Sequence, residues 1–223
     1  MQPRHISPAG VLWLAVTLAT PCRLAAQLPG APVLQNAWAA PGIVVALDFG
    51  GGSGTASGST VAGAAAWAPG NGRFQFSAGA GMNRATGSAN RAVYGARVAA
   101  PVTQMMGGNL GVAAFVGVGG GTVVTTDSLR AKSIVPAGLA IAYRRPVGVA
   151  GKGFSLYADP NYQYQSGSKN SKGYFRVGIG LDAGITSRFG VTVGLESGAN
   201  AAAGSVGPRG SLFGVGASMK LGR

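Results

Sequence analysis

From Gly42 onward, hydrophobic residues recur at every second position in short segments that are separated by turn residues. In the segment 173–184, for example, Phe175, Val177 and Ile179 alternate with polar or small residues. Because successive side chains of a strand point to opposite faces of a sheet, each segment predicts a strand with one apolar face. The predicted strands cover 42–50, 59–68, 73–82, 91–100, 109–119, 133–143, 154–164, 173–184, 189–197 and 210–221.

The lengths of these segments and of their connectors favour a membrane barrel. Each segment is close to the roughly 9–11 residues that a tilted strand needs to cross a bilayer. The connectors after the odd-numbered segments are mostly the longer ones, and they cover 51–58, 83–90, 120–132, 165–172 and 198–209. Transmembrane barrels have long outer loops and short periplasmic turns. We therefore predict an all-β fold: a single antiparallel up-and-down transmembrane β-barrel over 42–223, with ten strands, or with eight as the alternative.

Composition separates this barrel from a soluble β-sandwich, which would show the same alternation. Charged residues make up only 10% of the chain, whereas 47% is hydrophobic and 40 of 223 residues are glycine. A soluble sheet would carry far more charge on its exposed face. Aromatic residues also gather near the predicted strand ends, as in the two belts of membrane barrels. They are Trp67, Phe74, Tyr143, Phe154 and Phe189 at one end, and Phe49, Tyr162, Tyr164, Phe175 and Phe213 at the other.

The first 26 residues have the layout of a cleavable secretory signal peptide. A short polar start precedes the apolar run 9–20, and Leu24-Ala25-Ala26 offers a small-residue cleavage site. Residues 27–41 show no period and are predicted to form a periplasmic lead-in segment. Removing residues 1–26 takes away the only His and the only Cys and leaves 16 basic residues against 5 acidic ones. We expect export through the signal peptide and a place in a bacterial outer membrane.

Strand parity places most of the acidic residues inside the predicted barrel. Carboxylates that faced lipid would be costly, so inward placement is what a barrel demands. Opposite charges in a narrow lumen are expected to pair across it. The predicted lumen charge cluster contains Asp48, Arg97, Asp159, Arg176, Asp182, Glu196 and Lys220. It is interpreted either as a polar plug that closes the barrel or as a charged constriction in a narrow pore.

The predicted outer loops are basic. Asp127 is their only acidic residue, and the basic residues in or beside them are Arg84, Arg91, Arg130, Lys132, Lys169, Lys172 and Arg209. Such a surface suits neighbouring lipopolysaccharide phosphates, or adhesion to another polyanion. The loops lack the interleaved aromatic residues that stack on bases, so no specific nucleic-acid partner is expected.

Candidate chemistry is poor. Without a His, no Ser–His or Asp–His unit can form in the mature chain. Ser168 and Lys169 are neighbours in a segment of loop-type residues, where a solvated loop explains them better than a Ser–Lys pair. No set of residues indicates a zinc, calcium or nucleotide site. We expect no catalytic residue, no metal and no cofactor.

Over roughly 42–223, the predicted architecture resembles that of the small bacterial outer-membrane β-barrel proteins, the group of OmpA-like, OmpX-like and OmpW-like barrels. Barrels of this group often end in a strand with Gly followed by apolar residues spaced by two, and Gly216, Met219 and Leu221 fit that spacing. The final residue is Arg223, where an aromatic residue is usual. The resemblance implies recognition of the last strand by the barrel-assembly machinery, contact with outer-membrane lipid and lipopolysaccharide, and a monomer.

Two functions remain open from the sequence. The first is a non-enzymatic structural or surface-interaction barrel, closed by its own interior charges and displaying basic loops. The second is a narrow porin-like passive channel for small solutes or ions. Near-balanced charge in a tight lumen favours pairing over permeation, so the closed barrel is the preferred hypothesis.

Overall fold

The computed structural model describes residues 35–38, 41–52, 58–85, 90–125, 128–146, 153–166, 172–198 and 211–221. Residues 1–26, the predicted signal peptide, lie outside these ranges, so the cleavage site remains a prediction. Within the described part of the chain, no helix is both long enough and apolar enough to span a bilayer.

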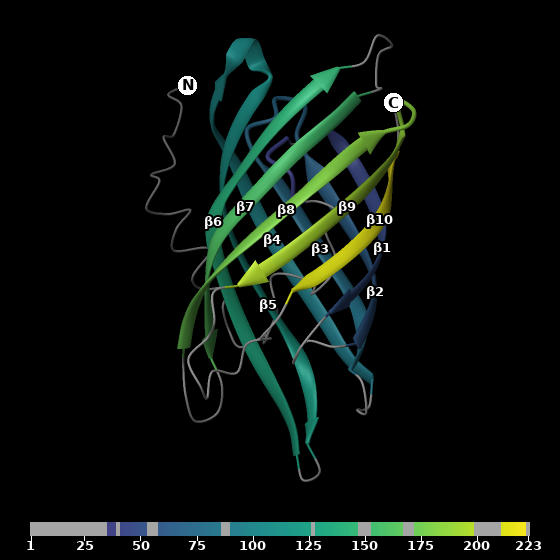
Figure 1. Cartoon of the computed structure of the whole chain (residues 1–223), viewed down its shortest axis with the longest axis vertical. Coiled ribbons are helices and arrows are strands. Elements are labelled where there is room, and N and C mark those ends of the chain that lie inside the picture. The colour runs from purple at the N-terminus through teal and green to yellow at the C-terminus, as the bar shows by residue number, and fades with distance from the viewer. Residues whose placement is uncertain are drawn as a thin grey trace, which may run out of the picture.

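Ten antiparallel strands close into one barrel in which each strand pairs with its neighbours in sequence, and the first pairs with the last (Figure 1). The predicted fold and strand number are therefore confirmed. The strands are β1 (Gly42–Gly52), β2 (Gly58–Ala68), β3 (Gln75–Ala85), β4 (Asn90–Met105), β5 (Leu110–Thr125), β6 (Ser128–Pro146), β7 (Gly153–Ser166), β8 (Lys172–Gly184), β9 (Phe189–Gly198) and β10 (Leu212–Leu221).

The seam between β1 and β10 closes the barrel. It runs without a register shift from the pair Ile43 and Leu221 to the pair Gly52 and Leu212. Because the strand number is even, β1 begins and β10 ends at the same end of the barrel. This end, which also carries the connections after the even-numbered strands, is called the turn end below, and the opposite one the loop end. Figure 1 shows β10 ending at the turn end.

Several strands extend beyond their predicted bounds. β5 and β6 continue to Thr125 and from Ser128, so most of the predicted loop 120–132 is a paired hairpin. β4 runs on past Pro101 to Met105, with a register shift between Pro101 and Thr103. A bulge lets a strand accept a proline that cannot donate to the ladder. The predicted contrast between long and short connectors is therefore smaller in the structure, because strand pairing takes up residues of the predicted loops.

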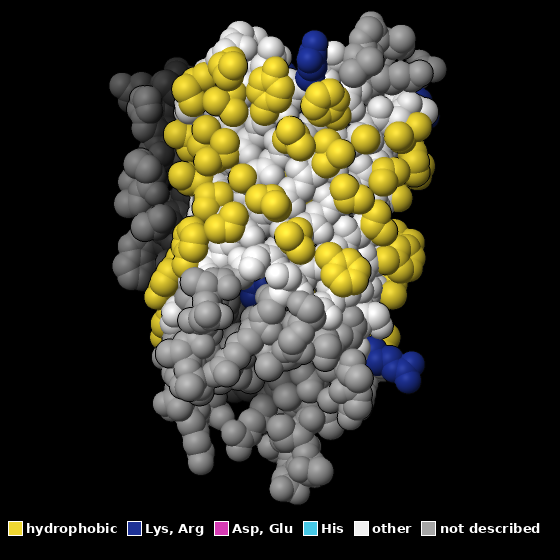
Figure 2. All heavy atoms as spheres, in the orientation of Figure 1, with side chains coloured by type: hydrophobic (Ala, Val, Ile, Leu, Met, Phe, Trp, Pro, Cys, Tyr) yellow, Lys and Arg dark blue, Asp and Glu magenta, His cyan; other side chains and the backbone are white. Residues whose placement is uncertain are grey.

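Hydrophobic side chains cover the outside of the barrel. Leu47, Phe49, Val193, Leu195 and Val215 are all more than 40% exposed. Figure 2 shows hydrophobic side chains spread over the visible wall, with the described Lys and Arg side chains toward its ends. Of the ten aromatic residues predicted to form belts, Tyr143 is half-buried and the other nine are exposed. The barrel is thus apolar outside, as alternation along its strands predicts.

Small residues on the inner face let neighbouring strands approach closely. A Cβ added at Gly138 of β6 would lie 2.3 Å from the carbonyl oxygen of Pro160 and 2.7 Å from the Cβ of Asn161, both in β7. A Cβ added at Gly63, on the outer face of β2, would meet nothing closer than 3.9 Å. The two glycines therefore differ in whether a methyl group can be accommodated.

Replacing Gly138 by Ala is expected to destabilise the barrel by about 1–3 kcal/mol, the usual effect of overpacking against backbone. Gly63→Ala is the matched control and should change the free energy of unfolding by no more than about 0.5 kcal/mol. Urea unfolding of the refolded barrel in detergent micelles measures both. Equal stability of the two variants would contradict the close approach of β6 and β7.

Candidate functional site in the barrel lumen

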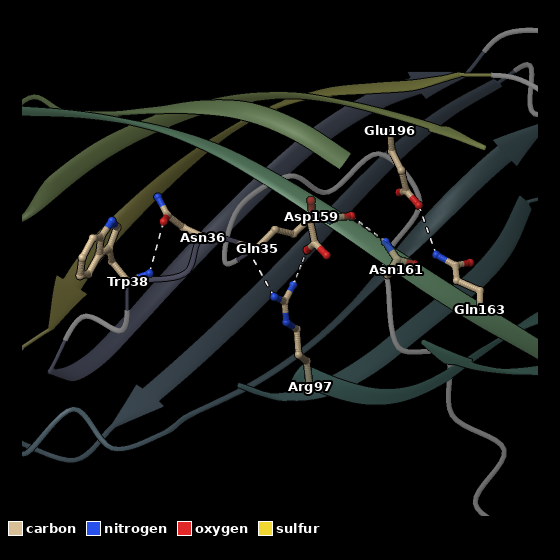
Figure 3. Close-up of polar contacts among 8 residues, drawn as sticks. All are labelled: Gln35, Asn36, Trp38, Arg97, Asp159, Asn161, Gln163 and Glu196. Atoms are coloured by element: carbon tan, nitrogen blue, oxygen red, sulfur yellow. Dashed lines mark hydrogen bonds and ion pairs between the residues drawn. The ribbon is translucent and has the colours of Figure 1, made fainter. Parts of the chain in front are cut away.

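The inner wall brings together most of the charges that the sequence placed inside. Asp48, Arg97, Asp159, Arg176 and Glu196 have exposed fractions of 1%, 6%, 0%, 2% and 8%. They lie on β1, β4, β7, β8 and β9, so the charges come from half of the ten strands of the barrel. Figure 3 shows part of this cluster, with the side chains pointing toward one another inside the wall.

The first ion pair spans the lumen. Arg97 Nη1 lies 2.8 Å from Asp159 Oδ2, although β5 and β6 separate their two strands in the wall. The guanidinium of Arg97 also stacks 3.6 Å from the centroid of the Phe115 ring. A buried guanidinium that meets both a carboxylate and an aromatic face is held in one orientation. Arg97 therefore forms a fixed bridge across the interior.

The second ion pair lies between adjacent strands. Arg176 Nε is 2.5 Å from Glu196 Oε1. Gln163 Nε2 donates to the same oxygen at 3.2 Å (Figure 3). Beside the first pair, Asn161 Nδ2 donates to the backbone oxygen of Asp159 at 3.0 Å. The two pairs and these amides place polar side chains from β4, β7, β8 and β9 in the interior.

The lumen also contains residues 35–38, which precede β1. Gln35 and Ala37 are 9% and 7% exposed. The backbone oxygen of Gln35 accepts a hydrogen bond from Arg97 Nη2 at 3.4 Å. The sequence placed these residues in a periplasmic lead-in, whereas the structure places them inside the barrel (Figure 3). Residues 35–38 are called the lumen segment below.

Asn36 anchors the lumen segment to two strands. Its Nδ2 donates to Ser155 Oγ at 2.9 Å and also to Asp182 Oδ2. Asp182 is half-buried in β8, and its other oxygen accepts from the hydroxyl of Thr192 in β9. A single amide therefore links the segment to both β7 and β8.

Glycines in the wall make room for the lumen segment. A Cβ added at Gly111 of β5 would lie 2.7 Å from the Trp38 ring, and one at Gly178 of β8 would lie 3.3 Å from Gln35 Oε1. Arg144 covers the Trp38 ring at 4.1 Å from its centroid. The alternation of residues along β5 and β8 gives no sign that these two glycines contact another segment. Residues 35–38 themselves have no period, so no sequence signal predicted the match.

The two remaining predicted lumen residues belong to neither of these two ion pairs. Asp48 is fully buried on the inner face of β1. Lys220 is half-buried near the end of β10, where its Cε would lie 3.6 Å from a Cβ at Gly42. It thus lies at the turn end.

The predicted basic loop residues are only partly described. Arg84 is exposed near the end of β3. Arg91 lies in β4, Arg130 and Lys132 in β6, and Lys172 in β8, so these four belong to strands. Lys169, Arg209 and Asp127 lie outside the described residues. Polyanion binding by the basic residues at the loop end of the barrel remains a prediction.

The polar side chains described in the lumen bind one another and link the strands of the wall. Among the described residues, no group of three His, Cys, Asp or Glu side chains could hold a metal ion. The Asp159 carboxylate is held by the Arg97 guanidinium, and the Glu196 carboxylate by the Arg176 guanidinium and the Gln163 side-chain amide. Such an arrangement fills and cross-links the interior.

The comparisons with known proteins concern the fold alone. No protein-family model and no curated protein matches the chain. The β domain of the Bordetella autotransporter BrkA has a similar structure, with a TM-score of 0.52 and 10% sequence identity over 80% of this chain and 98% of that one. The translocator domain of the autotransporter NalP from Neisseria meningitidis matches with a TM-score of 0.34 and 15% identity over 82% of this chain and 90% of that one.

At 10% identity, the likeness to BrkA shows that the closed barrel is of a kind found in autotransporter β domains. The sequence instead suggested the OmpA-like, OmpX-like and OmpW-like groups, and that closer assignment remains a prediction. The part of the resemblance that the comparison supports is the barrel architecture.

Breaking the ion pair across the lumen should cost more than replacing it. Asp159→Leu leaves the buried Arg97 charge without its partner and is expected to destabilise the barrel by about 3–5 kcal/mol. The double variant Arg97→Met with Asp159→Leu should recover most of that loss, because no buried charge remains. Arg84→Met, at an exposed position, is the control. Unfolding in urea compares the four proteins, and a double variant no more stable than Asp159→Leu would contradict this account.

Proposed function

We propose that this protein is a non-enzymatic outer-membrane β-barrel with a structural or surface-interaction role, whose lumen is closed from within. The observation that carries the proposal is the occupied interior. Arg97 and Asp159 bridge the wall, and the lumen segment lies against the same bridge through Gln35. In a barrel filled in this way, the surfaces free to contact other molecules are the outer wall and the two ends.

The membrane location is supported by the distribution of polarity. The outer wall exposes large apolar side chains, and the buried Asp and Glu side chains lie inside. Exposed apolar side chains are unfavourable in water and favourable in lipid. A lipid environment also requires that the Asp and Glu side chains lie inside the barrel. Closure also leaves no open strand edge, which is the condition for a sheet in hydrocarbon.

Small barrels have little spare interior. An eight-stranded barrel is filled by its own side chains, and ten strands enclose only slightly more. Here glycine and alanine on the inner wall leave added room, and the lumen segment occupies part of it. The basic residues near the loop end would then be the surface available to lipopolysaccharide or to another polyanion.

One observation favours the alternative of a narrow channel. Asp159 Oδ1 and Asn161 Oδ1 are buried, and neither accepts a hydrogen bond from the described residues. Buried polar atoms of this kind are usually served by water. A hydrated lumen could pass small ions if the lumen segment left it, so conductance decides between the two functions.

In planar lipid bilayers, the purified barrel is expected to show no stable single-channel steps. A variant that removes both obstructions, Arg97→Ala with Asp159→Ala and glycine at positions 35, 36 and 38, is expected to conduct. Arg84→Ala keeps the lumen intact and should be silent like the parent. Stable steps from the unmodified protein, with an ion selectivity that changes in Arg176→Ala or Asp182→Ala, would establish the channel instead.

The location has its own test. Expressed with its first 26 residues in a Gram-negative host, the protein should fractionate with the sarkosyl-insoluble membrane and migrate differently on gels before and after heating. A closed barrel resists detergent until heat opens it, which is the reason for the shift. Recovery as a soluble periplasmic protein with no shift would overturn the membrane assignment.

A further inference from the structure

A cavity of about 230 Å³ opens beside the lumen segment at the turn end. Asn36 and Trp38 form one side of it, and residues of β1, β2, β3, β8, β9 and β10 form the other. It lies away from the two ion pairs, since none of the four residues that form them lines it. This space is called the turn-end cavity.

One carboxylate stands on the wall of the turn-end cavity. Asp182 accepts hydrogen bonds from two neutral groups, the Asn36 amide and the Thr192 hydroxyl. Neither of the ion pairs formed by the described residues includes it. A carboxylate has about four acceptor sites, so Asp182 can accept further hydrogen bonds. A charged donor would form the strongest of these and would offset the cost of burying the charge.

The rest of the lining divides into polar and apolar parts. Gln75 and Ser218 supply an amide and a hydroxyl from β3 and β10. Val44 and Ala66, which share the inner-face parity of β1 and β2, supply hydrocarbon. A ligand that fits has one positive, hydrogen-bonding head and a short apolar body. An ammonium group carries three donors, which suits an acceptor carboxylate with neighbouring amide and hydroxyl oxygens.

We propose that the turn-end cavity binds a small organic cation of the primary alkylammonium class, with Asp182 as its anionic partner. The head donates to Asp182, and the alkyl body lies against Val44 and Ala66. The site goes beyond the closed-barrel function, because a barrel closed by its own side chains needs no ligand.

Binding of n-butylammonium to the refolded full chain in detergent, measured by isothermal titration calorimetry, tests the site. Asp182→Asn keeps the size of the side chain and removes its charge, so affinity should fall about tenfold or more with the loss of a charge-assisted bond. Asp48→Asn is the matched control, since it neutralises another inner-wall carboxylate that does not line the cavity. Its affinity should equal that of the parent.

A second variant keeps the charge and removes the space. Ala66→Leu fills the cavity from β2 and is expected to abolish binding of n-butylammonium with Asp182 intact. n-Butanol, which has the same body without the charge, should not bind detectably, and K⁺ should compete only weakly because it lacks the apolar body. Binding that survives both Asp182→Asn and Ala66→Leu would overturn the proposal, as would binding of butanol equal to that of the ammonium.

Trp38 provides a readout that does not depend on heat of binding. In a Trp13→Phe and Trp67→Phe background it is the only tryptophan of the chain, and it lines the cavity. Its emission should change saturably with n-butylammonium and not with butanol. No change in emission and no heat of binding in a folded, heat-modifiable barrel would reject the site. That result would leave the closed-barrel function standing, because conductance tests that function separately.

Discussion

Each strand of the barrel hydrogen-bonds to two neighbours, and the pairing of β1 with β10 completes the circle. In hydrocarbon, an unpaired backbone amide or carbonyl costs several kcal/mol, on the order of a lost hydrogen bond in an apolar medium. Nine of the ten strand pairs join consecutive strands, so they can form as hairpins. Only the seam joins residues that are far apart in sequence, such as Ile43 and Leu221. Closure therefore depends on one non-local pairing, which has to form against the largest loss of chain entropy.

Closure also determines the interior. Once the strands are in register, each residue is committed to lipid or lumen by its parity, and a charged side chain away from the strand ends has to face inward. Arg97, Asp159, Arg176 and Glu196 then share a confined volume, where pairing offsets the loss of hydration. The interior network is thus a consequence of the apolar exterior. A chain whose outer face is hydrocarbon has to place its charged side chains inside, and here four of them form two ion pairs.

The local part of this architecture could be predicted from the sequence, and the non-local part could not. A period of two is visible within a single segment, so the strand number and the inward side of Asp159 and Arg176 could be inferred. Strand ends were harder, because Gly119–Gly121 and Pro101 look like turn signals. In the structure the glycines sit in a hairpin that continues to Thr125, and a register shift accommodates the proline.

The partners inside the lumen were the least predictable. Arg97 meets Asp159 across two intervening strands, and that depends on barrel geometry that no single segment reveals. The lumen segment carries no period, and its fit depends on glycines in β5 and β8 that are distant from it in sequence. A pattern-based analysis detects faces of strands. It does not detect an irregular segment that is held by individual side chains.

The lumen segment is covalently attached to the wall that it contacts, because only residues 39–41 separate it from β1. A tether this short holds Asn36 and Trp38 near their sites at an effective concentration on the order of millimolar or higher, set by tether length. Modest contacts are then sufficient for high occupancy, and a free peptide of the same sequence would compete poorly. Occupancy is also independent of protein concentration. Each barrel carries this segment in fixed stoichiometry, from the moment that β1 takes its place in the wall.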